Sequence, residues 1–222
     1  MTLKINDIAP NFTANTTEGE LTFHDWLGDG YAVLFSHPKD FTPVCTTELG
    51  AVARLQAEFT KRNTKVIGLS IDGVSDHQRW KEDIKAATGS SVAYPLIGDP
   101  ELKVAKLYGM LPASEEGVAS NRTAGDNATV RTVFIVGPDK KIKLNLTYPM
   151  TTGRNFEEIL RVIDSIQITA RAPLATPEGW TQGDELVVSP ALSTEEAKER
   201  FGQVKEVLPY LRLTPAPAEL NR

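Results

Sequence analysis

The sequence has little cysteine: its 222 residues contain one, Cys45. A lone cysteine cannot form a disulfide within the chain, and it cannot build a thiolate metal cluster. The histidines His24, His37 and His77 show no spacing typical of metal ligands. We therefore expect no metal and no cofactor, and a chain that suits a reducing compartment such as the cytoplasm.

Long apolar runs, a leader and basic runs are also missing. Uninterrupted apolar stretches such as 31–35 are a few residues long, whereas a membrane span needs about 20. The amino terminus, MTLKINDIAPNF, has no apolar core of a secretory signal. The formal net charge is -5 and no Lys/Arg-rich run is present, so we expect neither a membrane nor a nucleic acid as partner.

The periodicity of the first three quarters of the chain predicts a central mixed sheet with helices on its faces, an α/β fold. Apolar residues make up 41% of the chain and charged residues 24%, as in ordinary globular domains. We predict strands at 31–36, 66–71, 130–136 and 142–146, and helices at about 42–61, 76–87, 102–107 and 156–167.

The residue pattern changes after residue 168. Prolines interrupt the chain repeatedly there, and only 194–201 is predicted to be helical. We predict one domain at 1–168 and a second at 169–222. So small a unit rarely holds a core alone, so its apolar side chains should be buried on the first domain or on a second subunit. These side chains are Trp180, Leu186, Val187, Val188, Phe201, Val204, Leu208, Tyr210 and Leu211.

Cys45 is predicted to lie in the first turn of a helix. Thr42 is a good N-cap and Pro43 suits the first helical position. Free amide groups and the helix dipole favour a thiolate there, and the Thr42 hydroxyl could donate to it or accept from a peroxide.

Lowering the pKa of a cysteine thiol from about 8.5 to about 6 requires roughly 3 to 4 kcal/mol. A helix terminus supplies up to about 2 kcal/mol, so a cation is needed as well. Spacing leaves five candidates open: Arg54, Arg79, Arg122, Arg131 and Arg154.

An inert, buried cysteine is the alternative to this reactive thiolate. A thioredoxin-type disulfide exchanger would carry Cys-x-x-Cys at the start of the helix. This chain has Thr42-Pro43-Val44-Cys45 instead, so dithiol exchange within one chain is impossible.

The segment 38–48, PKDFTPVCTTE, resembles the peroxiredoxin signature P-x-x-x-T-x-x-C. SHPKDFTPVCTTELG, SIDGVSDHQRW, VRTVFIVGPDKKIKLNLTYPMTTGRNFEEILRV and the tail from 169 onward are similar to the one-cysteine subfamily. The resemblance implies a thioredoxin-like fold with a C-terminal dimerisation domain. It also implies a thiol-dependent peroxidase that reduces hydrogen peroxide and organic hydroperoxides through a cysteine sulfenic acid. An external thiol, or another small or protein reductant, would convert the sulfenic acid back to the thiol. The protein would be a homodimer or a higher homo-oligomer.

The resemblance also implies residue roles. Cys45 would be the peroxidatic nucleophile, Thr42 would hydrogen-bond the peroxide and Pro38 would shield the sulfur from water. Arg131 would be the missing cation. His37 matches a histidine near the cysteine in this subfamily, and we place it with Arg154 in the substrate pocket.

Two further interpretations compete with a peroxidase. One is a peroxide sensor or redox relay that passes its oxidation to a partner and does not turn over efficiently. The other is a phospholipase, since mammalian members of the subfamily carry a lipase-like G-x-S-x-G near the amino terminus. In this chain that stretch runs from Gly28 to Ala32 with Gly30 in place of the serine. His24 and Asp139 match the rest of that site but cannot cleave an ester without a nucleophile.

Overall fold

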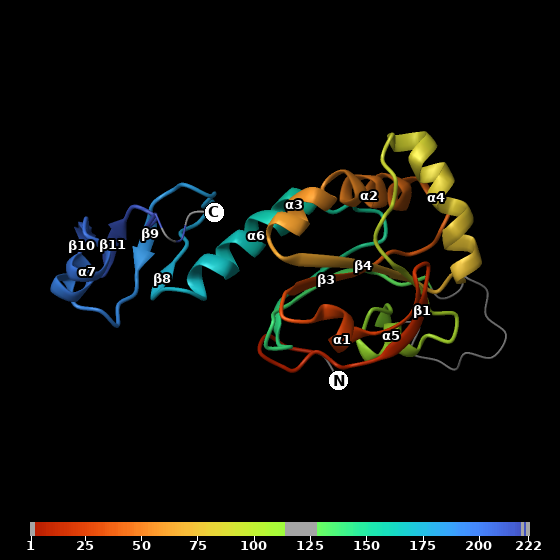
Figure 1. Cartoon of the computed structure of the whole chain (residues 1–222), viewed down its shortest axis with the longest axis horizontal. Helices are drawn as coiled ribbons and strands as arrows, with labels where there is room; N and C mark the ends of the chain where they lie inside the picture. Colours follow the sequence, from red (N-terminus) through yellow and green to blue (C-terminus); the bar gives the residue numbers. More distant parts are fainter. Residues whose placement is uncertain (1–2, 114–127, 219, 221–222) are drawn as a thin grey trace. The chain divides into compact units, whose positions relative to one another are not determined.

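The computed structural model describes residues 3–113, 128–218 and 220, and it divides into two compact units, Met1–Phe156 and Glu157–Arg222. The division falls after the first residue of helix α6 (Phe156–Thr169), whereas the boundary predicted from the sequence, after residue 168, falls at its end. That boundary stays a prediction. Each unit has its own sheet (Figure 1).

The first unit is built on a seven-stranded mixed sheet in the order β2-β1-β5-β4-β3-β6-β7. The central strand β3 pairs in parallel with β4 and antiparallel with β6. The strands are β1 (Thr13–Thr16), β2 (Gly19–Thr22), β3 (Tyr31–Ser36), β4 (Thr64–Ser70), β5 (Leu96–Gly98), β6 (Arg131–Val136) and β7 (Ile142–Tyr148). The predicted α/β architecture is confirmed.

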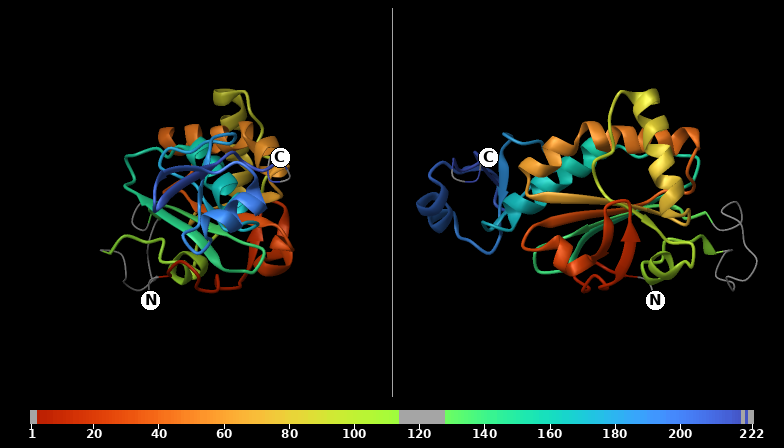
Figure 2. Two further views of the ribbon diagram at one scale, coloured as in Figure 1. Left: turned by 90° about the vertical axis from the view of Figure 1, so that its left-hand side faces the viewer. Right: turned by 45° about the vertical axis from the view of Figure 1, so that its right-hand side comes forward.

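Helices cover both faces of this sheet. Figures 1 and 2 show α2 and α4 over one face, and α1 and α5 against the other. The helices are α1 (Phe23–Leu27), α2 (Pro43–Arg54), α3 (Gln56–Lys61), α4 (Val74–Thr88) and α5 (Lys103–Leu107). In the part of the chain that the structure describes, no helix is long and apolar enough to span a membrane.

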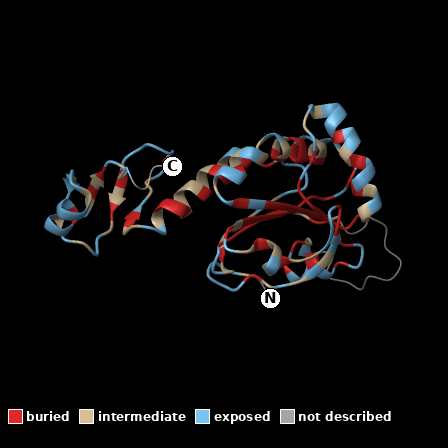
Figure 3. Cartoon of the chain, viewed as in Figure 1, coloured by how far each residue is buried: buried red, intermediate tan, exposed pale blue. Residues whose placement is uncertain are grey.

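The core of the first unit lies on both faces of the buried central strands (Figure 3). Successive side chains of a strand point to opposite faces. Accordingly, Leu34 joins a cluster with Phe23 and Tyr108 on one face. Phe35, the next residue of β3, contacts the rings of Tyr94 and Phe156. The carboxyl end of β3 is thus fixed from both sides, and the chain enters the predicted reactive loop from a rigid support.

The predicted helix at 42–61 is two helices, because α2 ends at Arg54 and α3 begins at Gln56, with Leu55 between them. Leu55 has φ -88° and ψ 2°, a conformation that breaks the regular hydrogen-bond ladder. The apolar positions keep one helical spacing through both helices, so the amphipathic pattern continues across the break between them. Pattern alone therefore could not locate the break.

The second unit holds a four-stranded sheet in the order β10-β11-β9-β8. Its elements after α6 are β8 (Leu174–Ala175), β9 (Leu186–Val188), α7 (Thr194–Phe201), β10 (Lys205–Leu208) and β11 (Leu211–Thr214). The predicted helix at 194–201 is confirmed and begins with a capping box between Ser193 and Glu196.

This unit buries Trp180, Leu186 and Val188 in a core of its own. The expectation that all the apolar side chains of the tail need another surface was wrong, since short strands missed from the sequence cover part of them. Large side chains nevertheless stay exposed at the β10–β11 hairpin, where Tyr210 is 76% and Leu208 43% exposed.

Candidate active site

Cys45 lies in the first turn of α2 and is 1% exposed. Thr42 is the N-cap residue with extended backbone angles, and Pro43 occupies the first turn as predicted. Amide groups at the start of a helix lack carbonyl partners within it, and they present the positive end of the helix dipole. Cys45 is thus placed where an anion is favoured and bulk water is excluded.

Arg131 provides the cation next to this sulfur. It is the first residue of β6, which pairs with β3, so its register places it beside the loop that follows β3. Its Nη1 donates to Cys45 Sγ at 3.4 Å, and its Nε donates to the Met150 carbonyl at 2.8 Å. At an effective dielectric constant of about 20, two unit charges about 4 Å apart interact by about 4 kcal/mol, which exceeds the contribution of the helix terminus.

Glu48, one turn after Cys45 on α2, holds Arg131 in place. Glu48 Oε2 accepts from Arg131 Nη1 at 2.6 Å and from Arg154 Nη2 at 2.7 Å. Its Oε1 accepts from the backbone N–H and Nε of Arg154. Burial raises the pKa of Glu48, but hydrogen bonds and charge from Arg154, and the charge of Arg131, more than offset burial and hold that pKa below its ordinary value.

The charges of this buried group do not balance without Cys45. Glu48, Arg131 and Arg154 have side chains no more than 3% exposed, and two cations against one carboxylate leave one positive charge. A buried charge is costly unless it is paired. A thiolate at Cys45 would therefore complete the neutrality of the group.

Arg154, predicted in the substrate pocket, has its described contacts inside the protein. Besides Glu48, it donates to the Thr132 carbonyl at 3.0 Å, and its guanidinium lies 5.2 Å from the ring centroids of Phe35 and Phe156. These contacts suit a residue that orients Glu48 better than one that meets a substrate.

The hydroxyl of Thr42 donates to the Lys39 carbonyl at 2.8 Å and makes no capping hydrogen bond. A hydroxyl has one proton and two lone pairs. While this bond lasts, Thr42 can accept from a peroxide O–H but cannot donate to a thiolate. The loop is held tightly: Pro38 is buried, and Phe41 adopts φ 54°, which is unusual for a residue with a side chain.

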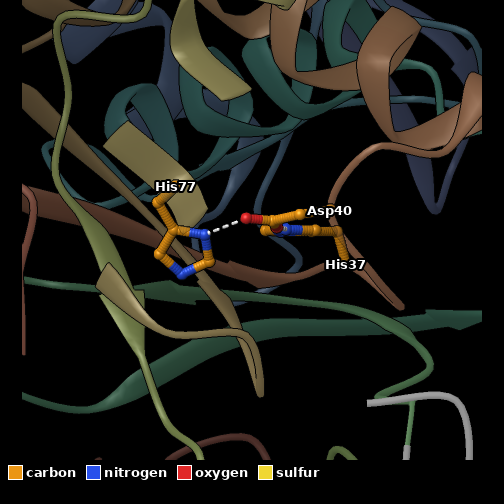
Figure 4. Close-up of side chains that lie close together, drawn as sticks. All are labelled: His37, Asp40 and His77. Atoms are coloured by element: carbon orange, nitrogen blue, oxygen red, sulfur yellow. Dashed lines mark hydrogen bonds and ion pairs between the residues drawn. The ribbon is translucent and has the colours of Figure 1, made fainter. Parts of the chain in front are cut away.

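His37 belongs to a buried cluster that the sequence did not reveal. His37 Nε2 lies 2.8 Å from Asp40 Oδ1, and His77 Nδ1 lies 2.5 Å from Asp40 Oδ2. Figure 4 shows the Asp40 carboxylate directed at the ring of His77. Burial raises the pKa of Asp40, but hydrogen bonds from His37 and His77 outweigh burial and lower it to about 2.

The same three residues are the described group that could hold a metal ion, since their ligand atoms lie within 4.8 Å of one another. The two histidines are far apart in the sequence, which is why spacing gave no hint of the group. The three side chains are buried, and the Asp40 carboxylate is already hydrogen-bonded to a ring nitrogen of each histidine. The group is therefore explained as a hydrogen-bonded cluster.

The residues of the lipase-like site do not form one. His24 Nε2 is hydrogen-bonded to the Ala9 carbonyl at 2.8 Å, and Asp139 pairs with Lys143 at 2.7 Å. A Cβ atom at Gly30 would lie 2.7 Å from the Asn63 carbonyl oxygen. A serine therefore does not fit at position 30 without a shift of the backbone.

Sequence reasoning identified Cys45 and Arg131, which the structure brings together. It missed Glu48, although its position three residues after Cys45 on the same helix face was a usable signal. Asp40 and His77 gave no comparable signal. Arg122, one of the candidate cations, lies outside the described residues.

A buried cysteine at the start of a helix, in contact with an arginine of a mixed sheet, is the arrangement of a thiol enzyme. Comparison with known proteins supports this class. Residues 5–145 match the AhpC/TSA family, and residues 165–203 match the C-terminal domain of 1-Cys peroxiredoxin. The chain belongs to the AhpC/TSA family and, within it, to the 1-Cys peroxiredoxins. It is a thiol-dependent peroxidase, as predicted.

Individual relatives cover nearly the whole chain. Peroxiredoxin-6 of rat (Rattus norvegicus) is 52% identical, over 97% of this chain and 98% of the relative. Peroxiredoxin PRX1, mitochondrial, of Saccharomyces cerevisiae is 51% identical, over 96% of this chain and 80% of the relative. The crystal structure of a C45S mutant of peroxiredoxin 6 from Arenicola marina is 48% identical with a TM-score of 0.89, covering 97% of this chain and 99% of that one. The predicted thioredoxin-like fold is thereby confirmed.

Proposed function

We propose that Cys45 is the peroxidatic nucleophile of this peroxidase. Its thiolate attacks one peroxide oxygen, an S–O bond forms, and the O–O bond breaks. The products are the sulfenic acid of Cys45 and an alkoxide or hydroxide, which takes up a proton to leave as alcohol or water. The observation that carries this proposal is the 3.4 Å contact between Arg131 Nη1 and Sγ of a cysteine buried in the first turn of α2.

The surrounding residues have distinct roles in this step. Arg131 stabilises the thiolate and the negative charge that develops on the peroxide. The free lone pairs of Thr42 accept from the peroxide O–H, because the hydroxyl proton is held by Lys39. Pro38 limits access of water to the sulfur. Glu48 and Arg154 orient Arg131.

Turnover requires a reductant from outside the chain, since there is no second cysteine to trap the sulfenic acid. A first external thiol forms a mixed disulfide with Cys45 and releases water. A second thiol then restores the Cys45 thiol and leaves as a disulfide. A solved neighbour, 50% identical with a TM-score of 0.89, is described as a yeast mitochondrial 1-Cys peroxiredoxin whose thiol is resolved via glutathione/thioredoxin systems. That description supports an external thiol as the reductant of this chain.

Compartment and assembly complete the proposal. A single cysteine favours a reducing compartment such as the cytoplasm, although one relative is mitochondrial. The exposed apolar hairpin of the second unit favours a homodimer or a higher homo-oligomer.

Peroxide consumption by the reduced protein tests the proposal, with a panel of thiols and ascorbate as reductants. The wild type should consume many equivalents of peroxide with at least one thiol, whereas Cys45→Ser should consume none. Consumption that stops at one equivalent with every reductant would favour the sensor. Activity that persists in Cys45→Ser would place the reactive group elsewhere.

A further inference from the structure

A pocket of about 290 Å³ lies beside the amino end of β4, between α3 and the segment that precedes β5. Helix α1 contributes Trp26 to its wall. Strand β3 runs parallel to β4 and pairs Tyr31 with Thr64 at this end. Cys45 follows the opposite, carboxyl end of β3. The pocket is therefore a feature of the first unit that is separate from the active site.

Hydrogen bonds hold the walls of this pocket in place. The Tyr94 hydroxyl donates to the Leu49 carbonyl of α2 at 3.0 Å. The Thr60 hydroxyl donates to the Gln56 carbonyl at 3.0 Å, and the Thr60 carbonyl accepts from the Asn63 N–H at 3.0 Å. Small-molecule sites in proteins are usually largely formed before the ligand arrives. Walls that are fixed in this way suit such a site.

Lys65 gives the pocket a positive charge. Among the described residues that line the pocket it is the one charged side chain, and no ion pair of its ammonium group is found in the described part of the chain. Its Nζ donates to the Trp26 carbonyl and lies 5.5 Å from the centroid of the Trp26 ring. An ammonium group has three protons to donate, so protons remain for a ligand. One unpaired positive charge matches a carboxylate better than a phosphate group, which carries about -1.5 to -2 at neutral pH.

The other walls combine apolar surface with uncharged polar groups. Trp26, Ala93 and Pro95 contribute apolar surface, and Gln56 and Asn63 contribute amides. The Oε1 atom of Gln56 is buried and has no hydrogen-bond partner among the described residues. A buried acceptor without a donor is uncommon, and rotation of this amide toward the pocket would let a bound molecule supply the donor. The unmet hydrogen bond is a second feature, independent of the charge, that points to a ligand.

We propose that this pocket binds a small organic carboxylate with an apolar body and one hydrogen-bond donor. The carboxylate accepts from Lys65 Nζ, and the donor reaches the amide oxygen of Gln56. The apolar body packs on Trp26 and Pro95. The volume lies at the lower end of the range for ligand pockets, so the molecule is small. Binding is non-covalent and independent of the peroxidase function.

Indole-3-carboxylate is a probe with these three features, and the indole N–H signals of the three tryptophans report where it binds. Trp26 lines the pocket, whereas Trp80 is hydrogen-bonded to the residue after Cys45. Trp180 lies in the core of the second unit. In nitrogen-15 NMR of the full chain, the Trp26 signal should shift with probe concentration and saturate. A shift of the Trp80 signal alone would place the probe at the active site, and no shift of any signal would show no binding. Either result would overturn the proposal.

The requirement for a negative charge is tested by a second probe and two variants. Indole-3-carboxamide is uncharged and should bind about fivefold more weakly, the upper end of what one exposed ion pair contributes. Lys65→Met should weaken binding of the carboxylate by a similar factor and leave the amide unaffected. Lys61→Met removes an exposed lysine of α3 that does not line the pocket, so it is the control. Equal affinity for the two probes, or equal weakening by both variants, would refute the assignment to a carboxylate.

The hydrogen bond to Gln56 is tested by removing each partner in turn. Gln56→Leu should weaken binding of indole-3-carboxylate by about fivefold, as loss of one hydrogen bond does. The 1-methyl derivative of the probe has no N–H and should bind the wild type equally weakly. Gln56→Leu should not weaken the methylated probe further, and a second full loss there would contradict this contact. If a variant does not fold, the titrations of the wild type with the three probes decide.

Discussion

At the scale of single residues, the active site contains a buried group in which positive charges outnumber negative ones. Glu48 neutralises one of its two arginines, and the other positive charge faces Sγ of Cys45. In the histidine cluster, Asp40 is hydrogen-bonded to both His37 and His77. The excess positive charge of the arginine–glutamate group therefore favours an anion at the sulfur.

Arg131→Met should slow the reaction of reduced protein with hydrogen peroxide by about 10²-fold, as loss of one charge-stabilising donor does in other enzymes. The methionine keeps most of the volume but leaves Glu48 paired with Arg154 alone. Stopped-flow rates under excess peroxide measure the effect. Arg54→Met, an exposed arginine on the same helix, is the matched control. Equal rates in wild type and Arg131→Met would remove Arg131 from the proposed mechanism.

Cys45 should also be oxidised irreversibly when peroxide exceeds reductant. No second cysteine traps the sulfenic acid, so further peroxide should give the sulfinic and then the sulfonic acid. Intact-protein mass spectrometry across a peroxide titration should show gains of two and three oxygen atoms. A reductant added first should suppress both products. A spectrum that keeps only the free thiol throughout would contradict the assignment.

Acid should destabilise the protein through the histidine cluster. The pKa of His37 is lowered by burial from 6.5, so the unfolded state binds its proton more readily, and stability falls as pH drops below about 6.5. Asp40 has a pKa of about 2 against 3.8 unfolded, so its contribution, about 2 kcal/mol, is full above 3.8 and lost as pH falls to about 2. Urea unfolding at a series of pH values measures both effects. Asp40→Asn should flatten the lower part of the curve, and an unaltered curve in that variant would show that the acid sensitivity arises elsewhere.

At the scale of elements, what the sequence could predict depended on the strength of the local pattern. The strand at 31–36 was predicted at its observed bounds because it is a continuous apolar run. The edge strands β1 and β2 were missed, since TANT and GELT have partly exposed faces and few apolar residues. Cys45 could be placed from Thr42-Pro43, but its contact with Arg131 depends on the pairing of β3 with β6, which no local pattern shows.

The start of β3 offers a test of the lipase-like segment. A side chain at position 30 meets the carbonyl oxygen of Asn63, just before β4. Gly30→Ser should therefore lower the free energy of unfolding by about 1–3 kcal/mol, as overpacking does, and should give no esterase activity. Thermal unfolding and a chromogenic ester assay measure the two outcomes. A stable Gly30→Ser protein with ester hydrolysis that His24→Gln abolishes would reverse this conclusion.

At the scale of the whole molecule, the second unit was the least predictable part. Its core forms from short strands and a buried Trp180, whose indole donates to the Asp184 carbonyl at 3.2 Å. Strands of two to four residues carry too little periodicity to be recognised. That the tail contacts another subunit stays a prediction. It now rests only on the apolar side chains that the core of the second unit leaves exposed.

The β10–β11 hairpin is the described surface that we expect to contact a second copy of the chain. Val207 is 46% exposed, Leu208 43% and Tyr210 76%, and β10 is an edge strand whose four residues are all exposed. Each large apolar side chain that becomes buried contributes roughly 1.5–3 kcal/mol, and a free strand edge invites pairing. A hydrophobic edge of this kind is rarely left uncovered.

The double variant Leu208→Ser, Tyr210→Ser should therefore shift the protein from dimer toward monomer without unfolding it, because both side chains lie outside the core of the second unit. Light scattering over a range of protein concentrations measures the dissociation. Leu107→Ser removes a side chain of similar exposure, 42%, from the first unit and serves as the control. A wild type that is monomeric at every concentration would contradict the prediction. Dissociation caused by the control alone would assign the contact to the first unit.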